Sequence, residues 1–83
     1  MLQIYRNVQE RIRIEDTSTG LQHIITLVKV FESCCMIDID GVAYILLRRG
    51  NMHIGACTVH ILRIERGVKF GLDASRHIKI NRM

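Results

Sequence analysis

The chain has 83 residues, which is enough for one small domain or for two half-sized units that share a core. Hydrophobic residues make up 48% of the chain and charged residues 24%, a globular composition that excludes intrinsic disorder. No apolar run approaches the length of a membrane span, and no basic-then-apolar leader opens the chain. We therefore expect a cytoplasmic protein with no membrane partner, and the odd count of three cysteines fits a reducing compartment.

The net charge of +4 is unevenly distributed along the chain. Residues 1–41 carry four basic and six acidic side chains, whereas residues 42–83 carry eight basic and two acidic ones, so a charge of −2 is joined to one of +6. Nine of the twelve cations are Arg, whose planar guanidinium pairs with phosphate and stacks on bases. The basic second half therefore suggests a nucleic-acid partner.

Apolar and polar residues alternate with period two along the chain, and no stretch sustains the 3.6-residue period of a helix. In Arg11–Ile14 the alternation is strict, with Arg on one face and Ile on the other. Turn-forming pairs such as Asp40-Gly41 separate the alternating segments. The sequence thus predicts an all-β protein with no helix. Its nine expected strands are Leu2–Arg6, Arg11–Ile14, His23–Phe31, Cys34–Ile39, Ala43–Arg49, Met52–Ile54, Thr58–Glu65, Val68–Leu72 and His77–Arg82.

The chain contains an internal repeat. Ile24–Arg49 and Thr58–Arg82 share the order of a long strand, a tight turn, a short strand ending in an aliphatic residue and Asp, and a strand ending in Arg. We expect a first unit of five strands at residues 1–49 and a second, incomplete unit at residues 50–83, packed as one compact body. The second unit lacks an opening strand of its own, and Ala43–Arg49 is the only segment available to supply one.

The order of motifs resembles the carbon storage regulator family (CsrA/RsmA). Met1–Asp16 contains the opening Met-Leu, an aliphatic strand with Arg6, a Val-x-Glu turn and an alternating second strand. Ile24–Arg49 resembles the remainder of that family without a gap. The resemblance implies small interlocked antiparallel sheets in a barrel-like sandwich, built either by a homodimer or by a single chain that imitates the dimer.

Members of this family bind GGA-containing loops in messenger RNA leaders. The resemblance therefore implies an RNA-binding post-transcriptional regulator, usually a repressor, that modulates translation or mRNA stability, with mRNA leaders or small regulatory RNAs as partners. The RNA surface would combine the first strand of one unit with the fifth strand of the other, and their parallel placement would set Arg6 and Arg82 on one rim. The matching positions are Ile4, Tyr5 and Arg6 in the first strand, and Leu47, Arg48, Arg49, Ile80, Asn81 and Arg82 in the fifth strands.

Two other interpretations remain open. Asn7 replaces the second Arg of the family's Arg-Arg pair, and Gln9 replaces the Gly of its Val-Gly-Glu turn. Together with the acidic first half, these changes favour a protein-interaction module or an antagonist of CsrA-type regulators with weak or no RNA binding. A third interpretation treats residues 17–56 as an insertion within one family domain made of residues 1–16 and 57–83.

Neither a metal site nor a catalytic centre is expected. His53, Cys57 and His60 are close in sequence, but they would point to different faces of alternating strands, and no fourth ligand is present. The adjacent pair Cys34-Cys35 lacks a Cys-x-x-Cys motif and fits buried packing. The carboxylates within Asp38–Asp40 are accompanied by no nucleophile and no Gly-rich phosphate loop. We therefore expect neither enzymatic activity nor a cofactor.

Overall fold

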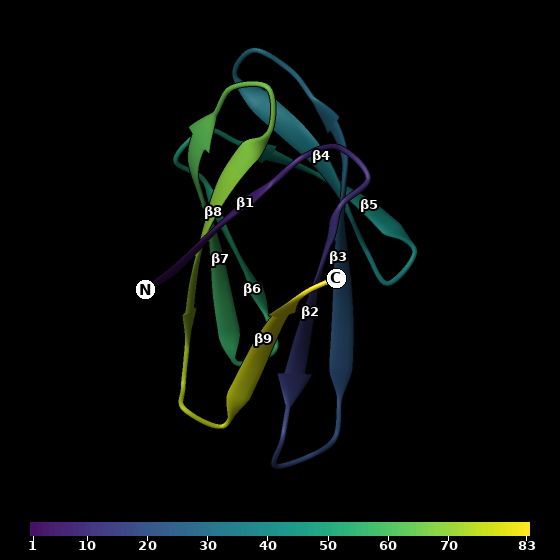
Figure 1. Cartoon of the computed structure of the whole chain (residues 1–83), viewed down its shortest axis with the longest axis vertical. Helices are drawn as coiled ribbons and strands as arrows, with labels where there is room; N and C mark the ends of the chain where they lie inside the picture. Colours follow the sequence, from purple (N-terminus) through teal and green to yellow (C-terminus); the bar gives the residue numbers. More distant parts are fainter.

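The computed structural model describes residues 1–83 and confirms the predicted all-β class, with nine strands and no helix (Figure 1). Each strand overlaps one predicted segment, and the boundaries differ by at most two residues. No helix in the structure is long and apolar enough to cross a membrane. The strands are β1 (Leu2–Arg6), β2 (Arg11–Asp16), β3 (Gln22–Val30), β4 (Cys34–Ile39), β5 (Val42–Leu47), β6 (Asn51–Ile54), β7 (Cys57–Ile64), β8 (Val68–Ala74) and β9 (Ile78–Arg82).

The strands form two antiparallel sheets. One sheet has the order β1-β8-β7-β6, and the other has the order β5-β4-β3-β2-β9. The strands at the ends of each order pair on one side only, so neither sheet closes into a barrel. The two sheets instead form an open sandwich around one hydrophobic cluster.

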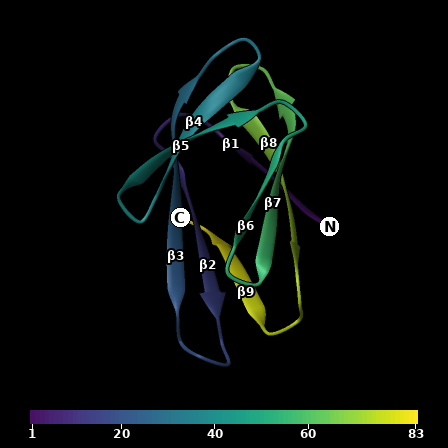
Figure 2. The ribbon, with the colours of Figure 1, turned by 180° about the vertical axis from the view of Figure 1, so that it is seen from behind.

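The first and last strands are exchanged between the two halves of the chain. In Figure 1 the purple strand β1 lies across the green strand β8 of the second half, and the yellow strand β9 lies beside the blue strand β2 of the first half. Both contacts are regular antiparallel ladders of five residue pairs each. The view from behind in Figure 2 shows the same arrangement, with β6 beside β7. The two halves are therefore interlocked, because each sheet needs a strand from the other half.

The core follows from the period-two alternation. Along β2, Ile12 and Ile14 are buried while the residues between and around them are more exposed, because successive side chains point to opposite faces of a strand. Each fully buried aliphatic side chain contributes about 1.5–3 kcal/mol of transfer free energy. No charged or polar side chain is buried in this core. Its members are Ile4, Ile12, Ile14, Ile25, Leu27, Cys35, Ile37, Ile39, Leu46, Ile54, Cys57, Val59, Ile61, Ile64, Val68, Phe70 and Leu72.

The predicted internal repeat is visible in the pairing of the central strands. The ladder between β3 and β4 shifts register between Leu27 and Lys29, and the ladder between β7 and β8 shifts between Ile61 and Arg63. A β-bulge adds one residue to one strand and bends the pair. The two central hairpins therefore have the same construction, bulge included.

The turns that precede β2 and β6 are also equivalent. Gln9 and Arg49 both have a positive φ, of 75° and 64°, which is uncommon for residues other than Gly. The amide of Gln9 donates to the carbonyl of Leu27 at 2.7 Å, and the amide of Arg49 donates to the carbonyl of Ile61 at 2.9 Å. The same backbone contact thus occurs twice, with donors 40 residues apart and acceptors 34 residues apart, although the side chains of Gln9 and Arg49 differ.

The pairing of β5 differs from what the internal repeat predicts. The repeat of Ile24–Arg49 in Thr58–Arg82 matches β5 to the last strand, β9. Val42 of β5 pairs with Ile39 of β4, just as Leu2 of β1 pairs with Leu72 of β8, so β5 takes the place that β1 takes in the other sheet. By its pairing, β5 is therefore the equivalent of β1. The last strand, β9, pairs with β2 and has no equivalent on β6.

The turn chemistry explains why β5 and β9 take different places. Asp40 and Gly41 both have a positive φ, of 53° and 91°, as a type I′ hairpin turn requires, so β5 folds back directly onto β4. The link between β8 and β9 is longer and crosses to the other sheet. There the carbonyl of His77 accepts hydrogen bonds from the amide of Thr17 at 2.9 Å and from its hydroxyl at 2.7 Å.

Candidate nucleic-acid interface

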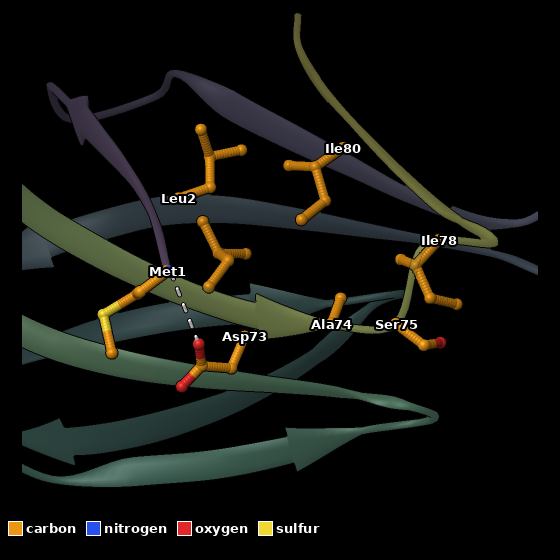
Figure 3. A pocket seen from close by; sticks show the side chains of 8 residues that line it. Met1, Leu2, Asp73, Ala74, Ser75, Ile78 and Ile80 are labelled. Atoms are coloured by element: carbon orange, nitrogen blue, oxygen red, sulfur yellow. Dashed lines mark ion pairs between the residues drawn. The ribbon is translucent and has the colours of Figure 1, made fainter.

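A groove of about 270 Å³ lies between β1 and β9, the edge strands of the two sheets. Figure 3 shows that Leu2 of β1 and Ile80 of β9 point toward one another across it. Six of the eight lining residues are hydrophobic. We call the region around β1 and β9 the closed side, because β9 covers the edge of β2 there. The lining residues are Met1, Leu2, Leu72, Asp73, Ala74, Ser75, Ile78 and Ile80.

The sequence of β9 determines which of its side chains reach the groove. Ile80 lies opposite Ile14, and Arg82 lies opposite Ile12, so both share the inward face of the sheet with these buried residues. Asn81 is in the intervening position and points to the outer face. The alternation Ile-x-Ile-x-Arg therefore directs two aliphatic side chains and one cation to the face beside β1.

The two edge strands run in the same direction, as the sequence analysis expected. Leu2 meets Ile78 and Ile80 at one end of the groove. At the other end Arg6 Nη1 lies 3.5 Å from the carbonyl oxygen of Met83, the residue that follows β9. The structure thus brings the ends of β1 and β9 together, with Arg6 and Arg82 at the same end.

The backbones of three Arg residues lie close together at the end of β1 and β9 where Arg6 reaches Met83. Arg6 Nε donates to the carbonyl of Tyr5 at 2.8 Å and lies 3.9 Å from Glu10 Oε1, and its Nη1 reaches the carbonyl of Arg11 at 3.5 Å. Arg11 and Arg82 are exposed, and neither side chain makes an ion pair or hydrogen bond in the structure. The amide of Met83 donates to the carbonyl of Arg11 at 3.1 Å, which places Arg11 next to the end of β9. We call Arg6, Arg11 and Arg82 the cation rim.

Arg11 is the member of the cation rim that the sequence analysis did not select. The strict alternation of Arg11–Ile14 already predicted that its side chain leaves the core. What the sequence could not reveal is that the end of β9 pairs with the start of β2, since this contact joins residues about 70 positions apart.

Asp73 is the one charged side chain that lines the groove. Its Oδ1 lies 3.9 Å from the terminal amine of Met1, and its Oδ2 lies 3.3 Å from His60 Nε2. The contact with His60 is an ion pair only when the imidazole is protonated. Asp73 is therefore already paired with a cation at this end of the groove.

The other two first-strand candidates, Ile4 and Tyr5, both contribute to the packing of β1. Ile4 is fully buried in the core and reaches no surface. Tyr5 points to the outer face, where its hydroxyl accepts a hydrogen bond of 2.8 Å from the amide of Gly67. A Cβ on Gly67 would collide with the carbonyl of Arg6 and with the Tyr5 ring, so only Gly fits this turn. Tyr5 thus fastens β1 to the turn between β7 and β8, with 42% of its surface left exposed.

The structure places Leu47, Arg48 and Arg49 away from the cation rim. Leu47 ends β5 and the two Arg residues follow it, and β5 forms the edge of its sheet opposite to β9. Arg48 Nη2 donates to the carbonyls of Glu32 at 3.3 Å and Ile64 at 3.4 Å, so this guanidinium is engaged with the backbone. The two predicted fifth-strand groups therefore lie at opposite edges of one sheet and do not form one surface.

Asp40, Cys35 and Cys57 lie outside the groove, and their surroundings shift their pKa values. Asp40 accepts a 2.9 Å hydrogen bond from the amide of Ile24, and this bond together with the nearby His23 lowers the pKa of its carboxyl. Burial raises the pKa of the thiols of Cys35 and Cys57 to about 11, so both are protonated and unreactive at neutral pH. No group of three His, Cys, Asp or Glu side chains is arranged to hold a metal ion.

The chain matches no protein-family model, no curated protein and no solved structure. The groove between β1 and β9 offers two free strand edges and aliphatic walls, and the cation rim lies beyond its lining at the end of the two strands. These groups suit a ligand that carries both flat apolar surfaces and negative charge.

Proposed function

We propose that this protein binds RNA, recognises GGA-containing hairpins in mRNA leaders and thereby modulates translation or mRNA stability, as the resemblance to carbon storage regulators implies. The observation that supports this most is the exchange of β1 and β9 between the two halves. Members of the resembled family form an RNA surface from the first strand of one unit and the fifth strand of the other. Here one chain sets two such strands side by side.

The chemistry of the closed side suits looped-out bases. RNA loops are read by hydrogen bonds to base edges, and a free strand edge supplies backbone donors and acceptors at regular spacing. The exposed surfaces of Leu2, Ile78 and Ile80 provide apolar contact for a base, while Arg82 and Arg11 are free to neutralise phosphates.

A titration with a labelled GGA hairpin tests the proposal, with a hairpin of equal length and a scrambled loop as the specificity control. The Arg82→Ala variant should bind the GGA hairpin about 5- to 150-fold more weakly, which corresponds to a loss of about 1–3 kcal/mol. The Lys29→Ala variant removes the same charge from an exposed position on β3 and should bind as the unmodified protein does. Affinity should also fall as the salt concentration rises, because phosphate contacts release counterions.

If the GGA hairpin and the scrambled hairpin bind equally, sequence-specific recognition is ruled out. If neither binds, the protein-interaction module becomes the better interpretation. In that case the purified protein should also show no excess absorbance at 260 nm.

A further inference from the structure

Strand β5 exposes apolar side chains on both of its faces. Val42 and Tyr44 point inward and are 54% and 37% exposed, while Ile45 and Leu47 point outward and are 52% and 64% exposed. The strand pairs with β4 on one side only, so its second edge of backbone donors and acceptors is free. A long apolar edge strand of this kind is normally covered in a soluble protein, since it promotes pairing with another chain.

Strand β6 lacks the neighbour that its equivalent possesses. Its counterpart in the repeat, β2, pairs with β9 on its outer side, whereas β6 ends its sheet. A groove of about 370 Å³ lies between β5 and β6, against about 270 Å³ on the closed side, where Ile78 and Ile80 form part of the wall. We call this region the open side. It is lined by His23, Ile39, Asp40, Val42, Tyr44, Met52, His53, Ile54 and Gly55.

We propose that two copies of the chain associate through their open sides, with β5 of each copy added to β6 of the other. In a single chain the outer edge of β5 is unpaired, and the outer edge of β6 lacks the neighbouring strand that β2 has. A two-fold axis between two open sides satisfies both at once and buries the same surface on each copy. The inward side chains Val42 and Tyr44 of both copies then form one shared apolar core.

The closed side shows which kind of strand the vacant edge accepts. There the covering strand contributes aliphatic residues two positions apart, Ile78 and Ile80, to the groove beside β1. Strand β5 has the same alternation of apolar inward residues, from Val42 to Leu46. A second β6 does not fit this role, because Ile54 is already buried and Met52 packs against its own core.

The distribution of charge permits this contact although each copy carries a charge of +4. No Lys or Arg lines the open-side groove, and Asp40 pairs with His23 at 2.6 Å. The cation rim lies at β9, at the opposite edge of the sheet from β5. Two cations, Arg48 and Arg49, follow β5, and the Arg48 guanidinium already donates to the carbonyls of Glu32 and Ile64. Association through the open side leaves the closed side free.

Light scattering after size exclusion tests the proposal directly. The protein should elute with twice the 9.6 kDa mass of one chain, and the Val42→Lys variant should elute with the mass of one chain. Leu2→Lys is the matched control, because Leu2 occupies the equivalent register position on β1 and is 44% exposed on the closed side. This variant should remain a dimer. A mass of one chain at every concentration, or a dimer that survives Val42→Lys, overturns the proposal.

Hydrogen exchange supplies a second measurement that needs no variant. Backbone amides of β6 should exchange more slowly as the chain concentration rises, because the partner strand protects this edge. Amides of β1, the other edge of the same sheet, should exchange at a rate that does not depend on concentration. Slowing at β1 instead of β6 would place the contact on the closed side and contradict the proposal.

Discussion

The closed and open sides are built from equivalent strands, yet they have different surfaces. On the closed side β1 and β9 border one groove, and the Arg residues of the cation rim lie at the end of the two strands, where Arg6 reaches Met83. On the open side β5 takes the place of β1, but no strand takes the place of β9, and apolar side chains remain exposed. The difference shows that one backbone plan gives a groove walled by a second strand where β9 is present and an exposed apolar edge strand where its equivalent is missing.

The largest difference in the free energy of unfolding should appear between substitutions at the inward positions of β1 and β5. Ile4 and Tyr44 occupy equivalent places, opposite Phe70 and Ile37, but Ile4 is 2% exposed and Tyr44 is 37% exposed. Ile4→Ala should lower the free energy of unfolding by about 2–5 kcal/mol, because it leaves a cavity in the core. Tyr44→Ala should cost about 1 kcal/mol at chain concentrations low enough to prevent association. Urea unfolding measures both values, and equal losses would contradict the difference in burial between the two positions.

A smaller effect should follow from loosening the end of β1. Tyr5→Phe removes the hydroxyl that accepts the 2.8 Å hydrogen bond from Gly67 and leaves a partly buried amide without a partner. We expect a loss of about 1 kcal/mol in the free energy of unfolding. Tyr44→Phe is the control on the open side, since no hydrogen bond of the Tyr44 hydroxyl is present. A loss at Tyr44→Phe as large as at Tyr5→Phe would show that the Gly67 contact contributes nothing specific.

The smallest effect concerns the turn that fixes β5 on the open side. The pKa of Asp40 is lowered by the Ile24 amide and by His23, so the folded protein holds this carboxylate ionised more strongly than the unfolded chain does. Its stabilising contribution is therefore present above the ordinary carboxyl pKa of 3.8 and is lost as the pH falls through the lower folded value. The melting temperature of Asp40→Asn should fall less over that acidic window than that of the unmodified protein. An unchanged pH dependence would exclude Asp40 as a contributor.

Much of the fold could be predicted from the sequence, because strands of period two and turn pairs are local signals. All nine strands and the repeat of the central hairpins followed from such signals. For β5 the sequence left two places open, because Ala43–Arg49 matches the last strand of the repeat and is also the only candidate for the second unit's opening strand. The turn at Asp40-Gly41 carries the deciding information, because two positive φ values return the strand to β4.

The candidate site was predictable only in part. The resemblance pointed to Arg6 and Arg82, which the structure places at the same end of one groove. It also pointed to Ile4, which packing removes from the surface, and to Arg48, whose guanidinium is held by backbone carbonyls. Burial and long-range pairing decide these outcomes, and neither can be read from the spacing of residues along the chain. Arg11 could not be selected for the same reason, because only the pairing of β9 with β2 brings it next to the end of β9.

Amide chemical-shift mapping with a GGA hairpin tests the central claim most directly, because it reports on the closed and open sides in the same sample. The account predicts that titration shifts the resonances of β1, β9 and the start of β2 around Arg11, while those of β5 and β6 stay in place. Shifts confined to β5 and β6, or none at all at saturating RNA, would contradict it.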